Sequence, residues 1–220
     1  KNPLNLKSIF RLVMFCRSNK IDLIDAHSSG GHSLAMWVKR FSPQVKLVVH
    51  RRVDNKIKRN LLSGRKYRNQ LVDEYIAVSE CVRKILIDYG VAEDKIHVIR
   101  DGVDPSPYEK IDKKKARQSL LNTLKMDPDS DVFLIGNASA LTHQKGTDTL
   151  LRAVKHLKEE GLHFHCIIAG DGVLRSQLEK MAQELGVDDW VTFLGFIDYV
   201  PEFLSGLDLL VMPSNNEGLG

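Results

Sequence analysis

The sequence predicts an α/β protein with two parallel-sheet domains, and three observations over its 220 residues support this. Short apolar runs alternate with segments of helical periodicity, the order that right-handed βαβ crossovers and parallel sheets produce. A segment with two prolines, residues 104–112, interrupts the alternation. The charge balance also reverses, because Lys and Arg outnumber Asp and Glu by 26 to 13 in residues 1–125 but number 6 against 15 in residues 126–220. We therefore expect domains over residues 1–107 and 108–220.

In the first domain, helices are expected where apolar residues recur every three to four positions, as from Leu6 to Met14. Pro43 ends the second helix and Gly90 ends the third, as these residue types commonly do. The small residues at 28–32 predict a loop before the second helix. The expected helices cover 5–18, the segment around 34–37 and 80–89, and the expected strands cover 21–26, 45–49, 74–79 and 96–100.

The second domain repeats the alternation after the proline segment, which we interpret as the linker. Gly186 ends one of its helices, and Pro201 begins a short one. The expected helices cover 113–125, 147–160 and 173–185, and the expected strands cover 132–136, 164–169, 190–194 and 207–212.

Composition limits the class of protein. Hydrophobic residues make up 43% and charged residues 27%, as in soluble globular proteins. The longest apolar runs are far shorter than the ~20 residues of a membrane span. Cys16, Cys81 and Cys166 are scattered and lack C-x-x-C spacing, which indicates a reducing compartment, the cytoplasm, without a disulfide framework or a zinc site.

Two positions are candidates for chemistry. His50 follows strand 45–49 at its carboxyl end, where open α/β sheets bind ligands, although a strand-end histidine satisfied within the fold is the alternative. Lys145 and Gly146 precede the helix that starts near Thr147, and a lysine beside free helix N–H groups suits a diphosphate. Neither G-x-x-x-x-G-K-[ST] nor G-x-G-x-x-G is present, which argues against a Walker loop and a dehydrogenase-type dinucleotide site.

The histidines do not predict a metal site. His163 and His165 share one face of a strand, and His27 and His32 flank a loop. Neither pair has Cys, Asp or Glu partners at a recognised spacing. We therefore expect no bound metal.

Residues 51–68 carry a dense group of basic side chains, against a single acid, Asp54. Such a group can attract anionic lipid headgroups at about 1 kcal/mol per residue. Nucleic acid is a poorer expectation, since Tyr67 is the single aromatic residue of the segment and no nucleic-acid-binding motif accompanies it. The basic residues are Arg51, Arg52, Lys56, Lys58, Arg59, Arg65, Lys66 and Arg68.

The closing stretch, residues 213–220, follows an apolar strand and holds a Pro-Ser turn, the carboxylate of Glu217 and two glycines. A glycine-rich turn after a buried strand commonly begins a helix whose N–H groups bind phosphate or hydroxyl groups. We interpret the chain as ending inside this motif.

Four stretches, in this order and spacing, resemble the retaining, nucleotide-sugar-dependent glycosyltransferases of family 4, which have the GT-B fold. They are residues 73–79 with 95–104, residues 144–153, residues 169–195 and residues 213–220. The resemblance implies two Rossmann-type domains facing a cleft, an acceptor-side domain over 1–107 and a donor-binding domain over 108–220. It also implies that both are incomplete, the first lacking its first strand and Gly-rich loop, the second ending inside an E-x7-E motif.

The resemblance also implies roles for single residues. His50 lies near the reacting centre, and Glu217 contacts the donor sugar. Lys145 binds the donor diphosphate, and Gly30 and Gly31 lie in a loop at the cleft. The remaining donor contacts are the nucleobase contacts of Gly195 and Phe196 and the sugar and phosphate contacts of Gly218, Leu219 and Gly220. The family's arginine five residues before the lysine is replaced by Ala140, so either Lys145 acts alone or Ser139, Thr142 or His143 donates instead.

The expected function is transfer of a sugar from a nucleoside diphosphate sugar to a glycan or lipid-linked acceptor, with retention and without a metal or other cofactor. Envelope polysaccharide or lipopolysaccharide synthesis, at the cytoplasmic face of an anionic membrane contacted by residues 51–68, is the expected setting. Two alternatives stay open: a nucleotide-sugar 2-epimerase of GT-B type, and a non-catalytic nucleotide-sugar-binding protein.

Overall fold

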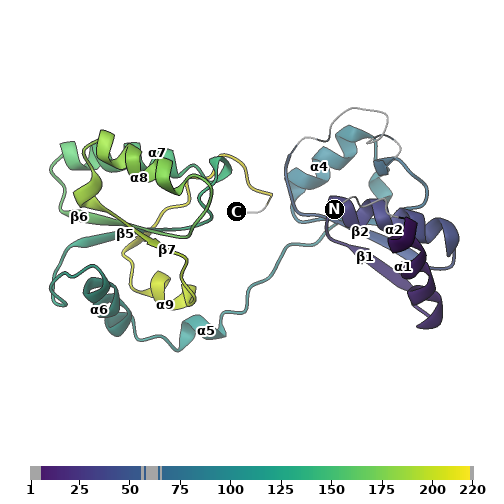
Figure 1. The fold of residues 1–220 in the computed structure, drawn as a ribbon, viewed down its shortest axis with the longest axis horizontal. Coiled ribbons are helices and arrows are strands. Elements are labelled where there is room, and N and C mark those ends of the chain that lie inside the picture. Colours follow the sequence, from purple (N-terminus) through teal and green to yellow (C-terminus); the bar gives the residue numbers. More distant parts are fainter. Residues whose placement is uncertain (1–5, 56, 58–63, 65, 219–220) are drawn as a thin grey trace. The chain divides into compact units, whose positions relative to one another are not determined.

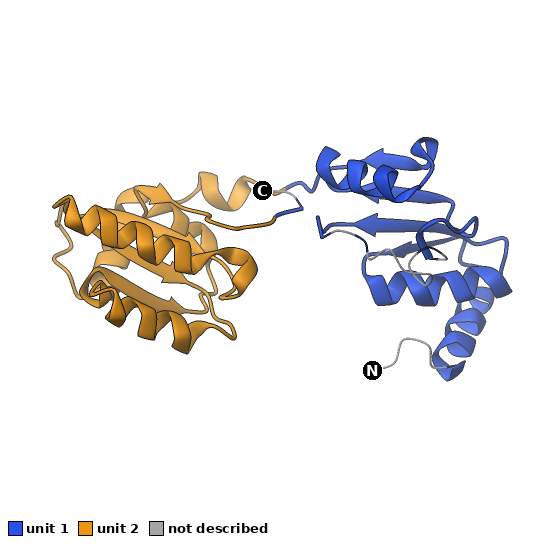
Figure 2. Cartoon of the chain, turned by 90° about the horizontal axis from the view of Figure 1, so that it is seen from above, with its two compact units in different colours: residues 1–102, 217–220 blue, residues 103–216 orange. Residues whose placement is uncertain are grey.

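The computed structural model describes residues 6–55, 57, 64 and 66–218. The chain forms two compact units, residues 1–102 with 217–220 and residues 103–216 (Figure 2). Each unit contains one parallel sheet, which confirms the expected α/β class with two parallel-sheet domains. The division between the units falls at Gly102 and Val103, and the domain limits at residues 107 and 108 stay a prediction.

Unit 1 has a sheet in the order β1-β2-β3-β4 (Figure 1). Its buried face packs against α2 and α4, with Leu47 and Tyr75 at the centre of the core. α1 packs on α2 instead, around Val38. The elements are α1 (Leu6–Ser18), β1 (Leu23–Ala26), α2 (Ser29–Phe41), β2 (Lys46–Arg51), β3 (Glu74–Ala77), α4 (Glu80–Tyr89), η1 (Glu93–Lys95) and β4 (Ile96–Val98).

A single carboxylate, that of Asp73, fixes the start of β3 against β2. Its Oδ2 accepts from the Leu47 N–H at 2.7 Å and from Lys39 Nζ of α2 at 2.9 Å, and the Asp73 N–H donates to the Leu47 carbonyl at 3.0 Å. Burial alone would raise the pKa of Asp73, but the hydrogen bonds from Lys39 and Leu47 outweigh burial and lower this pKa. The carboxylate therefore contributes to stability in its charged form.

Replacing Asp73 by Ala is expected to lower the free energy of unfolding of unit 1 by about 1.5–3 kcal/mol, the worth of hydrogen bonds to a charged group. The folded-state pKa lies below its ordinary value of 3.8, so the contribution is complete above that pH and disappears as the pH falls through the folded-state pKa. Urea unfolding at pH 7 and at pH 3, followed by circular dichroism, measures both effects.

The matched control is Glu74→Ala, because Glu74 pairs with His97 at 2.9 Å and both side chains are about half exposed. An exposed pair contributes at most about 1 kcal/mol. Equal losses in the two variants, or an Asp73→Ala deficit that is unchanged at pH 3, would contradict the prediction.

Unit 2 has a sheet in the order β7-β6-β5-β8. Helices α7 and α8 cover one face and α6 and α9 the other (Figure 1), each over its own hydrophobic core. β6 is buried at every position, as the predicted continuous apolar run requires. The elements are α5 (Ser106–Glu109), α6 (Lys113–Thr123), β5 (Phe133–Ala138), η2 (His143–Lys145), α7 (Thr147–Glu159), β6 (Phe164–Ala169), α8 (Arg175–Glu184), η3 (Asp188–Trp190), β7 (Val191–Gly195), α9 (Val200–Ser205) and β8 (Leu209–Leu210).

The start of β8 is held by Asp208. Its Oδ2 accepts from the Leu134 N–H and from Arg117 Nη1 of α6, both at 2.7 Å. The Asp208 N–H donates to the Leu134 carbonyl at 3.0 Å. The carboxylate thus joins β8, β5 and a covering helix at one point.

The structure differs from the expected elements in several places. Residues 28–32 are not a loop, since α2 begins at Ser29 and the Ser28 hydroxyl caps it by accepting from the Gly31 N–H at 3.0 Å. The segment expected as the linker contains the short helix α5, because the first turn of a helix tolerates proline, and its role as the linker stays a prediction. The expected buried strand 207–212 pairs only over Leu209–Leu210, which lie at an edge of the described sheet and are about half exposed.

Candidate functional site

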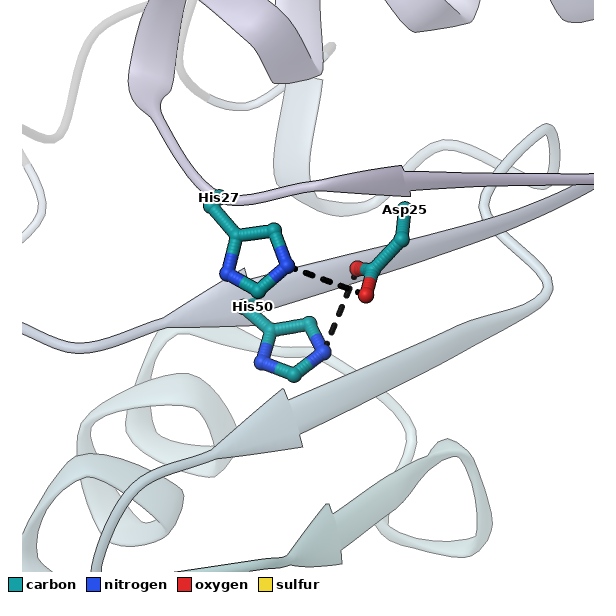
Figure 3. A group of neighbouring side chains, drawn as sticks. All are labelled: Asp25, His27 and His50. Atoms are coloured by element: carbon teal, nitrogen blue, oxygen red, sulfur yellow. Dashed lines mark hydrogen bonds and ion pairs between the residues drawn. The ribbon is translucent and has the colours of Figure 1, made fainter. Parts of the chain in front are cut away.

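A cluster of two histidines and one carboxylate lies at the carboxyl ends of β1 and β2 in unit 1 (Figure 3). His27 Nε2 is 3.0 Å from Asp25 Oδ2, and His50 Nε2 is 3.2 Å from Asp25 Oδ1. The two imidazole rings are stacked with centroids 4.1 Å apart. His50, the predicted candidate, therefore shares one carboxylate with a second histidine.

Strand geometry accounts for the cluster. β1 and β2 pair in parallel with Asp25 opposite Val48 and Ala26 opposite Val49. Continuing this register by one residue places His27 opposite His50. Asp25 lies two residues before His27, on the same face of the pleat. Sequence reasoning missed Asp25 and His27, and the signal was the D-x-H spacing at the end of one strand beside H at the end of the next.

The two histidine pairs that were weighed as metal sites and rejected, His27 with His32 and His163 with His165, lie in different surroundings in the structure. His32 is buried in α2 against Tyr67 and Tyr75, and burial lowers its pKa to about 3. His165 is buried in β6 with its Nε2 2.8 Å from Thr192 Oγ1, whereas the His163 side chain is 73% exposed. His32, His163 and His165 do not belong to the Asp25 cluster.

In unit 2 the strand order reverses at β5, which has β6 on one side and β8 on the other. Open α/β sheets bind ligands at such a switch point, outside the carboxyl ends of the strands. The segments after β5 and β8, residues 139–146 and 211–216, meet there. The Val211 N–H donates to the Gly136 carbonyl at 2.8 Å, and Asn137 Nδ2 donates to the Val211 carbonyl at 2.8 Å.

The Gln144-Lys145-Gly146 loop is fixed to residues 213–216 at this point. Gln144 Nε2 donates to the Asn216 carbonyl at 2.8 Å, and the Asn215 N–H donates to the Gln144 carbonyl at 2.8 Å. Gly146 has φ +64°, and a Cβ there would overlap the Pro213 carbonyl oxygen. Lys145 is the last residue of η2 and lies just before the N-terminus of α7, in a segment held in place by these hydrogen bonds. A larger residue at Gly146 would disturb this segment.

The other predicted donor residues of unit 2, Gly195 and Phe196, lie at the carboxyl end of β7. Gly195 has φ +79° and its carbonyl accepts from the Gly170 N–H at 2.6 Å. Phe196 is 79% exposed. The backbone here is fixed, whereas the aromatic ring is available to a ligand.

The end of the described chain, Glu217 and Gly218, groups with unit 1. The Ser79 hydroxyl donates to the Gly218 carbonyl at 2.6 Å. Leu219 and Gly220 lie outside the described residues. The roles of these four residues at a donor sugar stay predictions.

The described members of the basic segment contact the protein itself. Arg51 is buried and donates to Tyr67 Oη at 3.0 Å, and Arg52 pairs with Asp101. Lys66 Nζ donates to Ser29 Oγ at 2.8 Å. Arg51 is therefore not part of a surface for anionic lipid, and the expected membrane contact stays a prediction. Arg68 lies over the Tyr89 ring, and Lys56, Lys58, Arg59 and Arg65 lie outside the described residues.

Comparison with known proteins gives a match to a family model in each half of the chain. Residues 1–107 match the family model "Glycosyltransferase Family 4", and residues 125–220 match "Glycosyl transferases group 1". Within the described part of the chain, no helix is long and apolar enough to cross a membrane.

The 2-deoxystreptamine glucosyltransferase of Streptomyces kanamyceticus is 32% identical over 139 residues, which are 60% of this chain and 34% of that protein. The lipopolysaccharide core biosynthesis glycosyltransferase LpsE of Rhizobium meliloti is 35% identical over 104 residues, 47% of this chain and 29% of that protein. The matched part thus spans about a third of these relatives. The structure of Anabaena HepE with UDP and glucose has a TM-score of 0.78 and 22% identity, covering 94% of this chain and 56% of that one.

Proposed function

We propose that this chain is a GT-B glycosyltransferase and takes part in moving a sugar from a nucleoside diphosphate sugar to a glycan or lipid-linked acceptor with retention of configuration. The relatives named for glucosyl transfer and lipopolysaccharide core synthesis support this class of reaction. They give no support to the epimerase or to the non-catalytic binding protein. Cell-envelope synthesis is the proposed setting.

The observation that carries the proposal is the loop of Lys145, tied by hydrogen bonds to residues 213–216 at the switch point of unit 2. A diphosphate beside the N-terminus of α7 meets the helix dipole, free N–H groups and the lysine charge. These groups stabilise the negative charge that develops on the leaving diphosphate, without a metal ion. A UDP-bound structural relative supports the nucleotide part of the donor.

The proposed division of roles gives His50 and Glu217 to the reacting sugar and Lys145 to the diphosphate. Gly195 and Phe196 contact the base, and the amides of Gly218, Leu219 and Gly220 contact sugar and phosphate. Ala140, which stands where the family has an arginine, leaves Lys145 as the principal cation for the diphosphate.

Lys145→Ala is expected to weaken the binding of UDP, or of whichever nucleoside diphosphate the protein prefers, by about 10- to 100-fold, the worth of a charge-assisted hydrogen bond. Titration calorimetry with UDP, GDP and ADP measures this. The control is Lys155→Ala on α7, where the lysine pairs with Glu159 at 3.8 Å. Equal affinities of Lys145→Ala and the unmodified protein would rule out the diphosphate role. Proton NMR of the product formed from the matching nucleotide sugar then gives the anomeric configuration, which tests whether it is retained.

A further inference from the structure

We propose that Asp25, His27 and His50 form a binding site for a divalent transition-metal ion of the Zn²⁺ class. The ion would bind to unit 1, and the proposal does not rest on the transferase activity, for which no metal is invoked. This ion site shares His50 with the proposed transferase site, so an ion bound to this imidazole would keep it from the reacting sugar. Three side chains that ligate such ions well are brought together by two neighbouring strands (Figure 3).

The spacing of the ligand atoms suits an ion. One ligand atom from each of the three residues lies within 4.8 Å of the other two. His27 Nε2 is 3.0 Å from Asp25 Oδ2, and His50 Nε2 is 3.2 Å from the other oxygen, Oδ1. Ligands bound at about 2.0–2.2 Å in tetrahedral or octahedral geometry are about 3.0–3.5 Å apart. The ligand atoms are therefore close enough for one ion, and the two imidazoles would turn out of their stacked arrangement to coordinate it.

The chemistry of the ligands selects the class of ion. Two imidazoles and one carboxylate favour Zn²⁺, Co²⁺ and Ni²⁺, whereas Mg²⁺ and Ca²⁺ prefer sites made of oxygen. Three protein ligands are also the number that zinc sites with an exchangeable water use. An ion of this class would keep a position for a ligand from solution.

The cluster is both positioned and accessible. Asp25 belongs to β1 and His50 to β2, so the parallel register sets their separation. The side chains of His27 and Asp25 are 52% and 39% exposed and that of His50 is 20% exposed. An ion can therefore reach the ligands from solvent without unfolding the sheet.

Metal-free protein titrated with Co²⁺ is expected to bind one equivalent and to show the visible d–d absorption of an ion with imidazole ligands. Zn²⁺ is expected to displace it, and millimolar Mg²⁺ is not. His27→Gln and Asp25→Asn are each expected to weaken binding at least about tenfold, since loss of even an outer-shell partner costs that much. Both residues are partly exposed, so thermal unfolding should confirm that the variants fold.

The matched control is His97→Gln, because His97 also pairs with a carboxylate, Glu74, at 2.9 Å on the same sheet. That pair has two ligands where the Asp25 cluster has three, so its loss should leave the Co²⁺ affinity unchanged. No cobalt binding, equal affinities in all variants, or an equal loss in His97→Gln would overturn the proposal and leave the cluster as a hydrogen-bonded one.

Discussion

Replacing His50 by Ala is expected to lower kcat for sugar transfer by about 10²–10³-fold, while the affinity for the nucleoside diphosphate stays within a few-fold of its original value. The expectation rests on the proposed function, in which the imidazole contacts the reacting sugar. Removing a group that stabilises the charge developing in the transition state typically lowers kcat by such a factor. His50 is held for this by its bond to Asp25 and by stacking on His27.

Steady-state rates with the donor identified by calorimetry test this, and His97→Ala is the control from the same sheet. A loss confined to KM would assign His50 to binding alone. Unchanged kcat and KM in His50→Ala would exclude the catalytic role of His50. Absence of turnover of any donor by the unmodified protein would instead favour the non-catalytic nucleotide-sugar-binding protein.

Replacing Gly170 by Ala is expected to lower the free energy of unfolding of unit 2 by about 2–6 kcal/mol, from about 1–3 for backbone strain and about 1–3 for overpacking. Gly170 has φ +129°, a conformation open to glycine, and a Cβ there would overlap the Ser139 carbonyl oxygen. The added Cβ would meet a backbone oxygen and its own position is fixed by the backbone, so no side-chain rotation relieves the contact. Urea unfolding followed by Trp190 fluorescence in a Trp37→Phe background reports unit 2.

Gly186→Ala is the control, because Gly186 has φ +65° with nothing within 4 Å of the added Cβ. It should cost about 1–2 kcal/mol, the strain of a left-handed residue alone. Equal losses in the two variants would show that the contact with Ser139 contributes nothing.

Periodicity and helix-ending residues predicted most elements because those signals are local. The predicted bounds of β6 agree with the structure to the residue. All six positions of this strand are buried, so the whole run was recognisable as one strand. β1 was predicted too long because Ile21 packs with α1 instead of joining the sheet. The extent of β8 depends on which strand it pairs with, and sequence spacing does not contain that information.

The site was predicted one residue at a time. His50 and Lys145 were found from their places at a strand end and a helix start, which are local features. Predicting the Asp25 cluster requires knowledge of the register between β1 and β2. Predicting the contact between residues 144 and 216 requires knowledge that β5 and β8 are neighbours. Pairings of this kind are set by the packing of the whole sheet.

Asp73 and Asp208 hold their strands by the same local arrangement, one in each unit. Each aspartate lies just before a strand and exchanges hydrogen bonds with the backbone of the second residue of the neighbouring strand. Its carboxylate also accepts a hydrogen bond from a basic side chain of a helix. Both act at the amino ends of parallel strands, whereas the candidate residues lie at the carboxyl ends. A strand of four to six residues separates the two edges by about 13–20 Å. Sequence change at the carboxyl edge can therefore alter specificity while the alignment of the strands is maintained from the opposite edge.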